Sequence, residues 1–124
     1  MKRTTCVVFL AFALTGCMAT TGNYRPLGST TYPPRATNCD VTIFKDAPPS
    51  RTYESISQLD VHLEKTFFLP SDYDSAIGDL KRQACRSGAD GIVDIKEEHS
   101  SYLETKIYNL SGTGIRFSDR TSQQ

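Results

Sequence analysis

The sequence contains no tryptophan, only two histidines and only two methionines, and its 14 basic side chains are balanced by 14 acidic ones. A chain without an excess of positive charge lacks the electrostatic basis of nucleic-acid binding, so we expect no nucleic-acid partner. The chain also lacks any apolar run of 18 residues, so we expect no permanent membrane-spanning helix.

The longest apolar run lies close to the N-terminus, at residues 6–14. Lys2 and Arg3 precede it, and small residues follow it at Thr15 and Gly16. A positive start, a short apolar core and small residues are typical of a signal peptide. We therefore predict that residues 1–16 are a signal peptide that is cleaved off.

The tetrapeptide Leu14-Thr15-Gly16-Cys17 resembles the lipobox of bacterial lipoproteins. The resemblance implies cleavage before Cys17 and attachment of lipid to its thiol. Several acyl chains would anchor the protein stably, because each buried methylene contributes about 0.8 kcal/mol. In that family an aspartate after the cysteine favours the inner membrane, so Met18 implies the outer membrane, with the domain facing the periplasm. The alternative is an ordinary secretory signal that happens to contain a cysteine.

Removal of residues 1–16 from the 124-residue chain leaves 108 residues with 12 basic and 14 acidic side chains. This length suits one small domain with a modest core. Residues 17–38 are rich in Thr, Ser, Gly and Pro, and we predict a lipidated N-terminus and a flexible tether there. We place the domain at residues 39–118 and a frayed tail at residues 119–124.

The elements expected within the domain come from apolar spacing. We predict strands at residues 41–44 and 53–68, the second with a bulge near residues 57–58. A polar turn at residues 97–101 would separate two further strands, at 92–95 and 102–117.

A helix is predicted at residues 72–87, where apolar side chains recur at helical spacing. Ser71 is the expected N-cap, with Asp74 completing a capping box, and Gly88 is the expected left-handed C-cap. The order strand, strand, helix, strand, strand predicts an α+β fold with one helix packed on a small antiparallel sheet.

The stretch from Ala84 to Val93, Ala-Cys-Arg-Ser-Gly-Ala-Asp-Gly-Ile-Val, resembles the helix-to-strand junction of small bacterial envelope lipoproteins. It is similar to the domain of the Rcs-pathway stress-sensor lipoprotein and its heavy-metal-binding-domain relatives. The resemblance covers residues 39–118. The Rcs sensor carries more cysteines than the two in this domain, so its signalling role cannot be transferred to this chain.

Two cysteines remain in the domain after export, Cys39 and Cys85. Exported proteins meet oxidising conditions, so the pair suggests a disulfide, and two free thiols are the alternative. On a helical wheel, Cys85 lies at the flank of the apolar stripe, where a purely buried thiol is less expected. The cysteines lack Cys-x-x-Cys spacing, which argues against a redox site.

The candidates for chemistry are sparse. His62 and His99 lack the close ligand spacing of a zinc site, and we expect both to face solvent, so we predict no metal and no cofactor. Four carboxylates lie close in sequence, but we expect them to face solvent as well: Asp90, Asp94, Glu97 and Glu98.

The sequence therefore predicts a non-enzymatic envelope lipoprotein that interacts with an envelope protein, senses envelope stress or has a structural role. The alternative is a periplasmic module that binds a small ligand or a metal, and a weaker alternative is a cell-wall hydrolase or its helper. Five aromatic residues are possible anchors for a partner, although most are expected to fill the core: Tyr53, Phe67, Phe68, Tyr102 and Tyr108.

Overall fold

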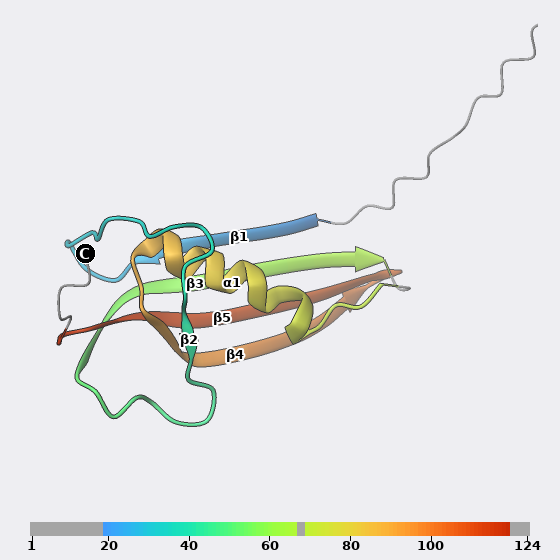
Figure 1. Cartoon of the computed structure of the whole chain (residues 1–124). Helices are drawn as coiled ribbons and strands as arrows, with labels where there is room; N and C mark the ends of the chain where they lie inside the picture. The colour runs from blue at the N-terminus through green and yellow to red at the C-terminus, as the bar shows by residue number, and fades with distance from the viewer. Residues whose placement is uncertain (1–18, 67–68, 120–124) are drawn as a thin grey trace, which may run out of the picture.

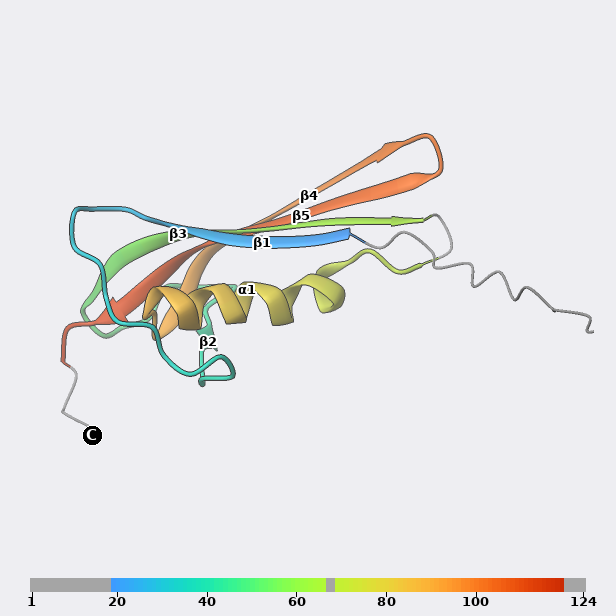
Figure 2. The same cartoon turned by 90° about the horizontal axis from the view of Figure 1, so that it is seen from above.

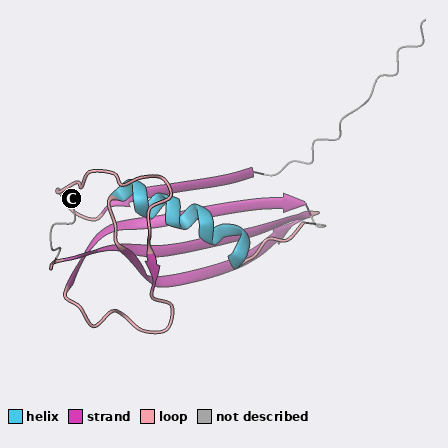
Figure 3. Ribbon diagram, in the orientation of Figure 1, coloured by secondary structure: helices cyan, strands magenta, loops and turns pink. Residues whose placement is uncertain are grey.

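A computed structural model describes residues 19–66 and 69–119 of the protein. These residues form one helix and five strands, which confirms the α+β class (Figure 3). In chain order the elements are β1 (Ala19–Pro26), β2 (Thr42–Ile43), β3 (Tyr53–Thr66), α1 (Tyr73–Ser87), β4 (Gly91–Tyr102) and β5 (Thr105–Phe117).

The five strands form one mixed sheet in the order β1-β3-β5-β4-β2 (Figure 1). Strands β1, β3, β5 and β4 pair antiparallel, whereas the two-residue β2 runs parallel to the start of β4. The prediction of a purely antiparallel sheet is therefore wrong at this edge. Because β1 and β2 occupy opposite edges, the chain between them must cross the whole domain.

Strand β1 lies within the segment that was predicted to be a tether. The prediction for residues 17–38 is wrong over residues 19–26, which pair with β3 along their full length. Most side chains of β1 are exposed, and Tyr24 packs against the core. The strand is therefore held mainly by its backbone hydrogen bonds to β3, which leave no trace in the apolar pattern.

Helix α1 begins one residue later than predicted and has a different N-cap. Asp72, not Ser71, is the N-cap, and its carboxylate accepts a hydrogen bond from the Ser75 backbone N–H at 3.0 Å. A hydrogen bond from the Ser75 hydroxyl, together with this backbone bond, lowers the pKa of the Asp72 carboxyl below its usual value. Gly88 confirms the predicted C-cap, with a φ of 83° that favours glycine.

The core lies between α1 and one face of the sheet, as Figure 2 shows from above. The helix contributes small and apolar side chains, including Ala76, Leu80 and Ala84, all fully buried. The central strand β3 alternates along its length, with Leu59, Val61 and Leu63 against the helix and polar residues opposite. The buried side chains of the sheet come mainly from β3, β4 and β5: Ile56, Leu59, Val61, Leu63, Ile92, Tyr108 and Leu110.

Two irregularities shape the sheet. The pairing of β3 with β5 shifts between Ser55 and Ser57, one residue from the predicted bulge. The pairing of β4 with β5 shifts between Val93 and Lys96, where Asp94 has a φ of 53°. An extra residue in one strand of a pair changes the face of the sheet toward which the following side chains point.

The β4–β5 hairpin is longer than predicted. Residues 97–101, predicted as a polar turn, belong to β4, and that prediction is wrong. The turn lies instead at Leu103 and Glu104, between the paired residues Tyr102 and Thr105. The hairpin extends beyond the N-terminal end of α1 (Figure 2).

Several predictions fall outside the described residues. The signal peptide at residues 1–16, the lipidation site Cys17 and the aromatic residues Phe67 and Phe68 lie there. Residues 120–124 of the predicted tail also lie there, but Asp119 forms an ion pair with Arg51 at 2.7 Å.

Candidate functional site

The first candidate site is the segment that crosses the domain from β1 to β2, residues 27–41. It passes over the C-terminal half of α1 (Figure 1). Cys39 in this segment forms a disulfide with Cys85 of α1, with Cα atoms 5.8 Å apart. The structure therefore brings together the two cysteines that the sequence singled out, and the predicted disulfide is present.

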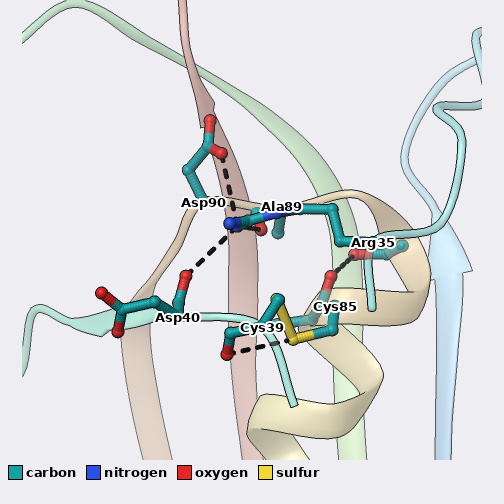
Figure 4. The surroundings of a disulfide bond; sticks show 8 residues. Arg35, Cys39, Asp40, Cys85, Ala89 and Asp90 are labelled. Atoms are coloured by element: carbon teal, nitrogen blue, oxygen red, sulfur yellow. Dashed lines mark hydrogen bonds and ion pairs between the residues drawn. A yellow bond between two sulfur atoms is a disulfide. The ribbon is translucent and has the colours of Figure 1, made fainter. Parts of the chain in front are cut away.

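Arg35 forms a second attachment of the crossing segment (Figure 4). Its guanidinium donates to the carbonyl oxygens of Ala89 at 2.8 Å and Asp40 at 3.2 Å. It also lies 3.5 Å from a carboxylate oxygen of Asp90. The Arg35 backbone N–H donates to the Cys85 carbonyl at 2.8 Å, and this carbonyl in the last turn of the helix also accepts from the Gly88 N–H at 3.1 Å.

Asp90 was expected to face solvent, but its side chain is only 15% exposed. Its second carboxylate oxygen accepts from the Phe117 backbone N–H at 3.0 Å. Asp90 thus links the crossing segment, the start of β4 and the end of β5. Sequence analysis missed Arg35, although it stands alone as a charged residue in a Pro- and Thr-rich stretch.

A third attachment involves Tyr32. Its hydroxyl donates to a Glu54 carboxylate oxygen at 2.7 Å, and its ring lies 4.4 Å from the Arg116 guanidinium carbon. Tyr32 also lies directly against Gly88, where an added Cβ would meet the Tyr32 Cβ at 2.8 Å. The Cys39–Cys85 disulfide, the Arg35 guanidinium and the Tyr32 ring together fix the crossing segment to the domain. The role of these three attachments is structural.

The second candidate site is the sheet face opposite α1, which we call the open face. Its β3 residues alternate with the buried ones, and three of them are Gln58, Asp60 and His62. The paired residues of the neighbouring strands complete this face, and most are short and polar: Thr21 and Asn23 in β1, Asn109, Ser111 and Thr113 in β5, and Lys96, Glu98 and Ser100 in β4.

His62 lies near the middle of the open face and its side chain is 43% exposed. Its Nδ1 is 2.5 Å from Asn109 Oδ1 and its Nε2 is 2.9 Å from Glu64 Oε1. Both neighbours are acceptors, so both ring nitrogens can donate only in the imidazolium form. The hydrogen bonds to Glu64 and Asn109 therefore raise the pKa of His62 above its ordinary value.

The other histidine, His99, lies on the other face of the hairpin. Its ring packs edge-on against Tyr108, with centroids 4.8 Å apart. The Tyr108 hydroxyl donates to Glu97 at 2.9 Å, and burial followed by this hydrogen bond raises the pKa of Tyr108. The two histidines thus lie on opposite sides of the sheet and do not converge. The Glu97 carboxylate accepts the hydrogen bond from Tyr108, which is a structural role.

The possible metal ligands in residues 19–66 and 69–119 do not form a cluster. Across those ranges, no three side chains from His, Cys, Asp and Glu are grouped so that they could hold a metal ion. Across the same ranges, no helix is long and apolar enough to cross a membrane. Besides the open face and the hairpin end, the described residues form a small pocket beside the crossing segment, with Tyr24, Tyr32 and Ser87 among its lining residues.

Comparison with known proteins gives one structural likeness. No protein-family model matches the chain, and no curated protein matches it. The fold is similar to the crystal structure of FvfA, a virulence factor of Francisella, with a TM-score of 0.54 and 22% sequence identity. The match covers 77% of this chain and 97% of that one. At this identity the likeness shows a shared fold alone.

Proposed function

We propose that the protein is a non-enzymatic lipoprotein of the cell envelope that is anchored through Cys17 and binds an envelope protein through its open face. The anchor would lie in the outer membrane, with the domain in the periplasm. The lipobox-like sequence before Cys17 supports the anchor. The observation that carries the binding role is the open face, because α1 covers only the opposite side of the sheet (Figure 2).

The composition of the open face suits a reversible contact. Charges of both signs are interspersed along it, with Asp60 and Glu98 near Lys96, and short side chains lie between them. Four strands over eight residues span roughly 500 Å², from strand spacings of about 4.8 Å and rises of about 3.3 Å. Patches of about 600 Å² or less per partner are typical of transient signalling contacts. A role in sensing envelope stress would need such a reversible contact.

In-cell photo-cross-linking tests this proposal. A photoreactive amino acid is placed at Asp60, which is exposed on the open face, and in a matched variant at Lys81, which is exposed on α1. We expect a reproducible adduct with one envelope protein at Asp60 and none at Lys81, identified by mass spectrometry. Equal adducts at both positions, or none at Asp60, would contradict docking through this face.

The anchor has its own test. We expect the N-terminal peptide of the purified protein to begin at Cys17 and to carry the mass of acyl chains. A Cys17→Ser variant should lose that mass and leave the membrane fraction. A free N-terminus without acyl mass would contradict the anchor while leaving the docking surface open to test.

A metal-binding role has narrower support, in the contact between His62 and Glu64. These two groups are fewer than the three or four protein ligands of most zinc sites. Calorimetry with zinc, copper and calcium decides between the roles: heat and a thermal shift that disappear in a His62→Gln variant would favour metal binding over protein docking.

A further inference from the structure

The end of the β4–β5 hairpin exposes two large apolar residues that are adjacent in the sequence. Tyr102 is 71% exposed and Leu103 is 86% exposed, which makes them the most exposed large apolar residues among those described. We call these two residues the tip. Isolated apolar residues are common on protein surfaces, but an adjacent pair at the end of a projecting hairpin is a different feature.

The backbone conformation at position 103 is unfavourable for leucine. Its φ of 54° lies in the left-handed region, where a residue with a Cβ other than Asn or Asp is uncommon. Two-residue hairpin turns favour Asn and Gly for this reason. Leucine here weakens the turn and contributes no packing, so folding does not explain it. Residues that conflict with local folding preference are expected at functional positions.

The sheet register places the tip at the same end of the domain as the start of β1. Ala19 pairs with Glu64, Glu64 with Ile107, and Ile107 with Ser100, so these four residues form one row across the sheet. Figures 1 and 2 both show the start of β1 and the hairpin turn at one end of the molecule. Leu103 lies three residues beyond this row, about 10 Å along the strand.

The proposed anchor at Cys17 is joined to the same row by a short length of chain. Cys17 precedes Ala19 by two residues, so the two are at most about 7 Å apart along the chain. A lipid on Cys17 would therefore hold this end of the sheet against the bilayer. The tip would then meet the bilayer at the depth where tyrosine rings favour the headgroup layer and leucine favours the hydrocarbon.

We infer that the tip inserts into the lipid surface that holds Cys17 and thereby fixes the domain upright, with the open face directed sideways. The inference rests on the proposed lipidation of Cys17. A lipid surface is favoured over a protein because the two-residue connection leaves little space between this end of the domain and the bilayer. The exposed carboxylate of Glu104, which follows Leu103 in the turn, limits insertion of the tip to the membrane interface. Because Glu104 is negatively charged, the attraction of the tip to the lipid comes from its apolar side chains.

The absence of tryptophan allows a direct test with a single fluorescent reporter. The full lipidated protein with Leu103→Trp is reconstituted into vesicles of phosphatidylethanolamine and phosphatidylglycerol. The matched control is Leu27→Trp, because Leu27 is 48% exposed and lies past the opposite end of β1. We expect blue-shifted emission and quenching by brominated acyl chains for Leu103→Trp, and neither effect for Leu27→Trp.

The outcomes separate the two proposals. Acylated protein that floats with the vesicles while Leu103→Trp is not quenched would overturn insertion of the tip and leave the anchor in place. Protein without acyl mass that does not float would overturn the anchor. A blue shift without quenching by brominated lipid would assign the tip to a protein contact, and equal quenching at both positions would overturn the upright orientation.

Discussion

Reduction of the disulfide between Cys39 and Cys85 should destabilise the domain strongly. The bond spans 46 residues of sequence, and the loop that it closes contains the end of the crossing segment, β2, β3 and nearly all of α1. In the chain-entropy treatment, a loop of this length lowers the entropy of the unfolded chain enough to contribute about 4 kcal/mol to the free energy of unfolding. For a domain of this size the melting temperature should fall by roughly 15–30 °C.

The measurement compares oxidised and reduced forms of a soluble chain of residues 18–124, which retains every described element. Far-UV circular dichroism follows urea unfolding, since the chain has no tryptophan. A variant with alanine at both Cys39 and Cys85 controls for effects of the reductant, and its stability should not respond to it.

The reasoning would be refuted if the free energies of unfolding of the oxidised and reduced forms differed by less than about 1 kcal/mol. In that case the hydrogen bonds of Arg35 and the contacts of Tyr32 would be sufficient to hold the crossing segment. A large loss of stability with retained β1–β3 pairing, seen by hydrogen exchange, would localise the effect to the crossing segment.

Three further predictions concern single positions. Leu103→Asn should raise the free energy of unfolding of the soluble chain by about 0.5–1 kcal/mol, because asparagine tolerates the left-handed conformation. Urea unfolding measures this difference, and a less stable variant would show that the Leu103 side chain packs against the domain in solution. By proton NMR, His62 should titrate above its ordinary pKa of 6.5, and Glu64→Gln should bring the midpoint down. Because the folded-state pKa is raised, the stabilisation from His62 is fully present below pH 6.5 and is lost as the pH rises through the raised pKa; an unchanged midpoint in the variant would refute the assignment. Gly114→Ala should destabilise the chain by about 1–3 kcal/mol, because the added Cβ would clash with the Ser57 hydroxyl oxygen. Unchanged stability in thermal unfolding would mean that β5 can move away from Ser57 at little cost.

The sequence carried clear signals for the elements that bury an apolar face. Helix α1 and strand β3 were predicted within one or two residues, because burial against each other imposes regular spacing on both. The disulfide was predicted from export, the number of cysteines and the position of Cys85 at the flank of the apolar stripe. The N-cap was predicted at Ser71 but lies at Asp72. A capping pattern in the sequence cannot distinguish two adjacent residues of similar capping ability, because only the backbone geometry separates them.

The missed elements lie where burial is one-sided or absent. Strand β1 has almost no buried side chain and is held by backbone pairing, which any polar sequence can make. The outer part of β4, residues 97–101, extends past the helix, so its apolar pattern is lost and it resembles a turn. Strand β2 depends on the crossing segment, whose position is set by Arg35 and Cys39 through contacts distant in sequence.

The distribution of constraints along the sheet also bears on how the protein would work. At the end near the crossing segment, a disulfide, an ion pair between Arg35 and Asp90 and another between Arg51 and Asp119 tie neighbouring elements together. At the opposite end, the two strands of the hairpin that carries Leu103 pair with each other up to Tyr102 and Thr105. A sheet fixed at one end and attached to lipid at the other would transmit a tilt of the hairpin to the open face. A partner bound there would therefore respond to the state of the membrane surface, and this would give a physical basis for the proposed envelope-sensing role.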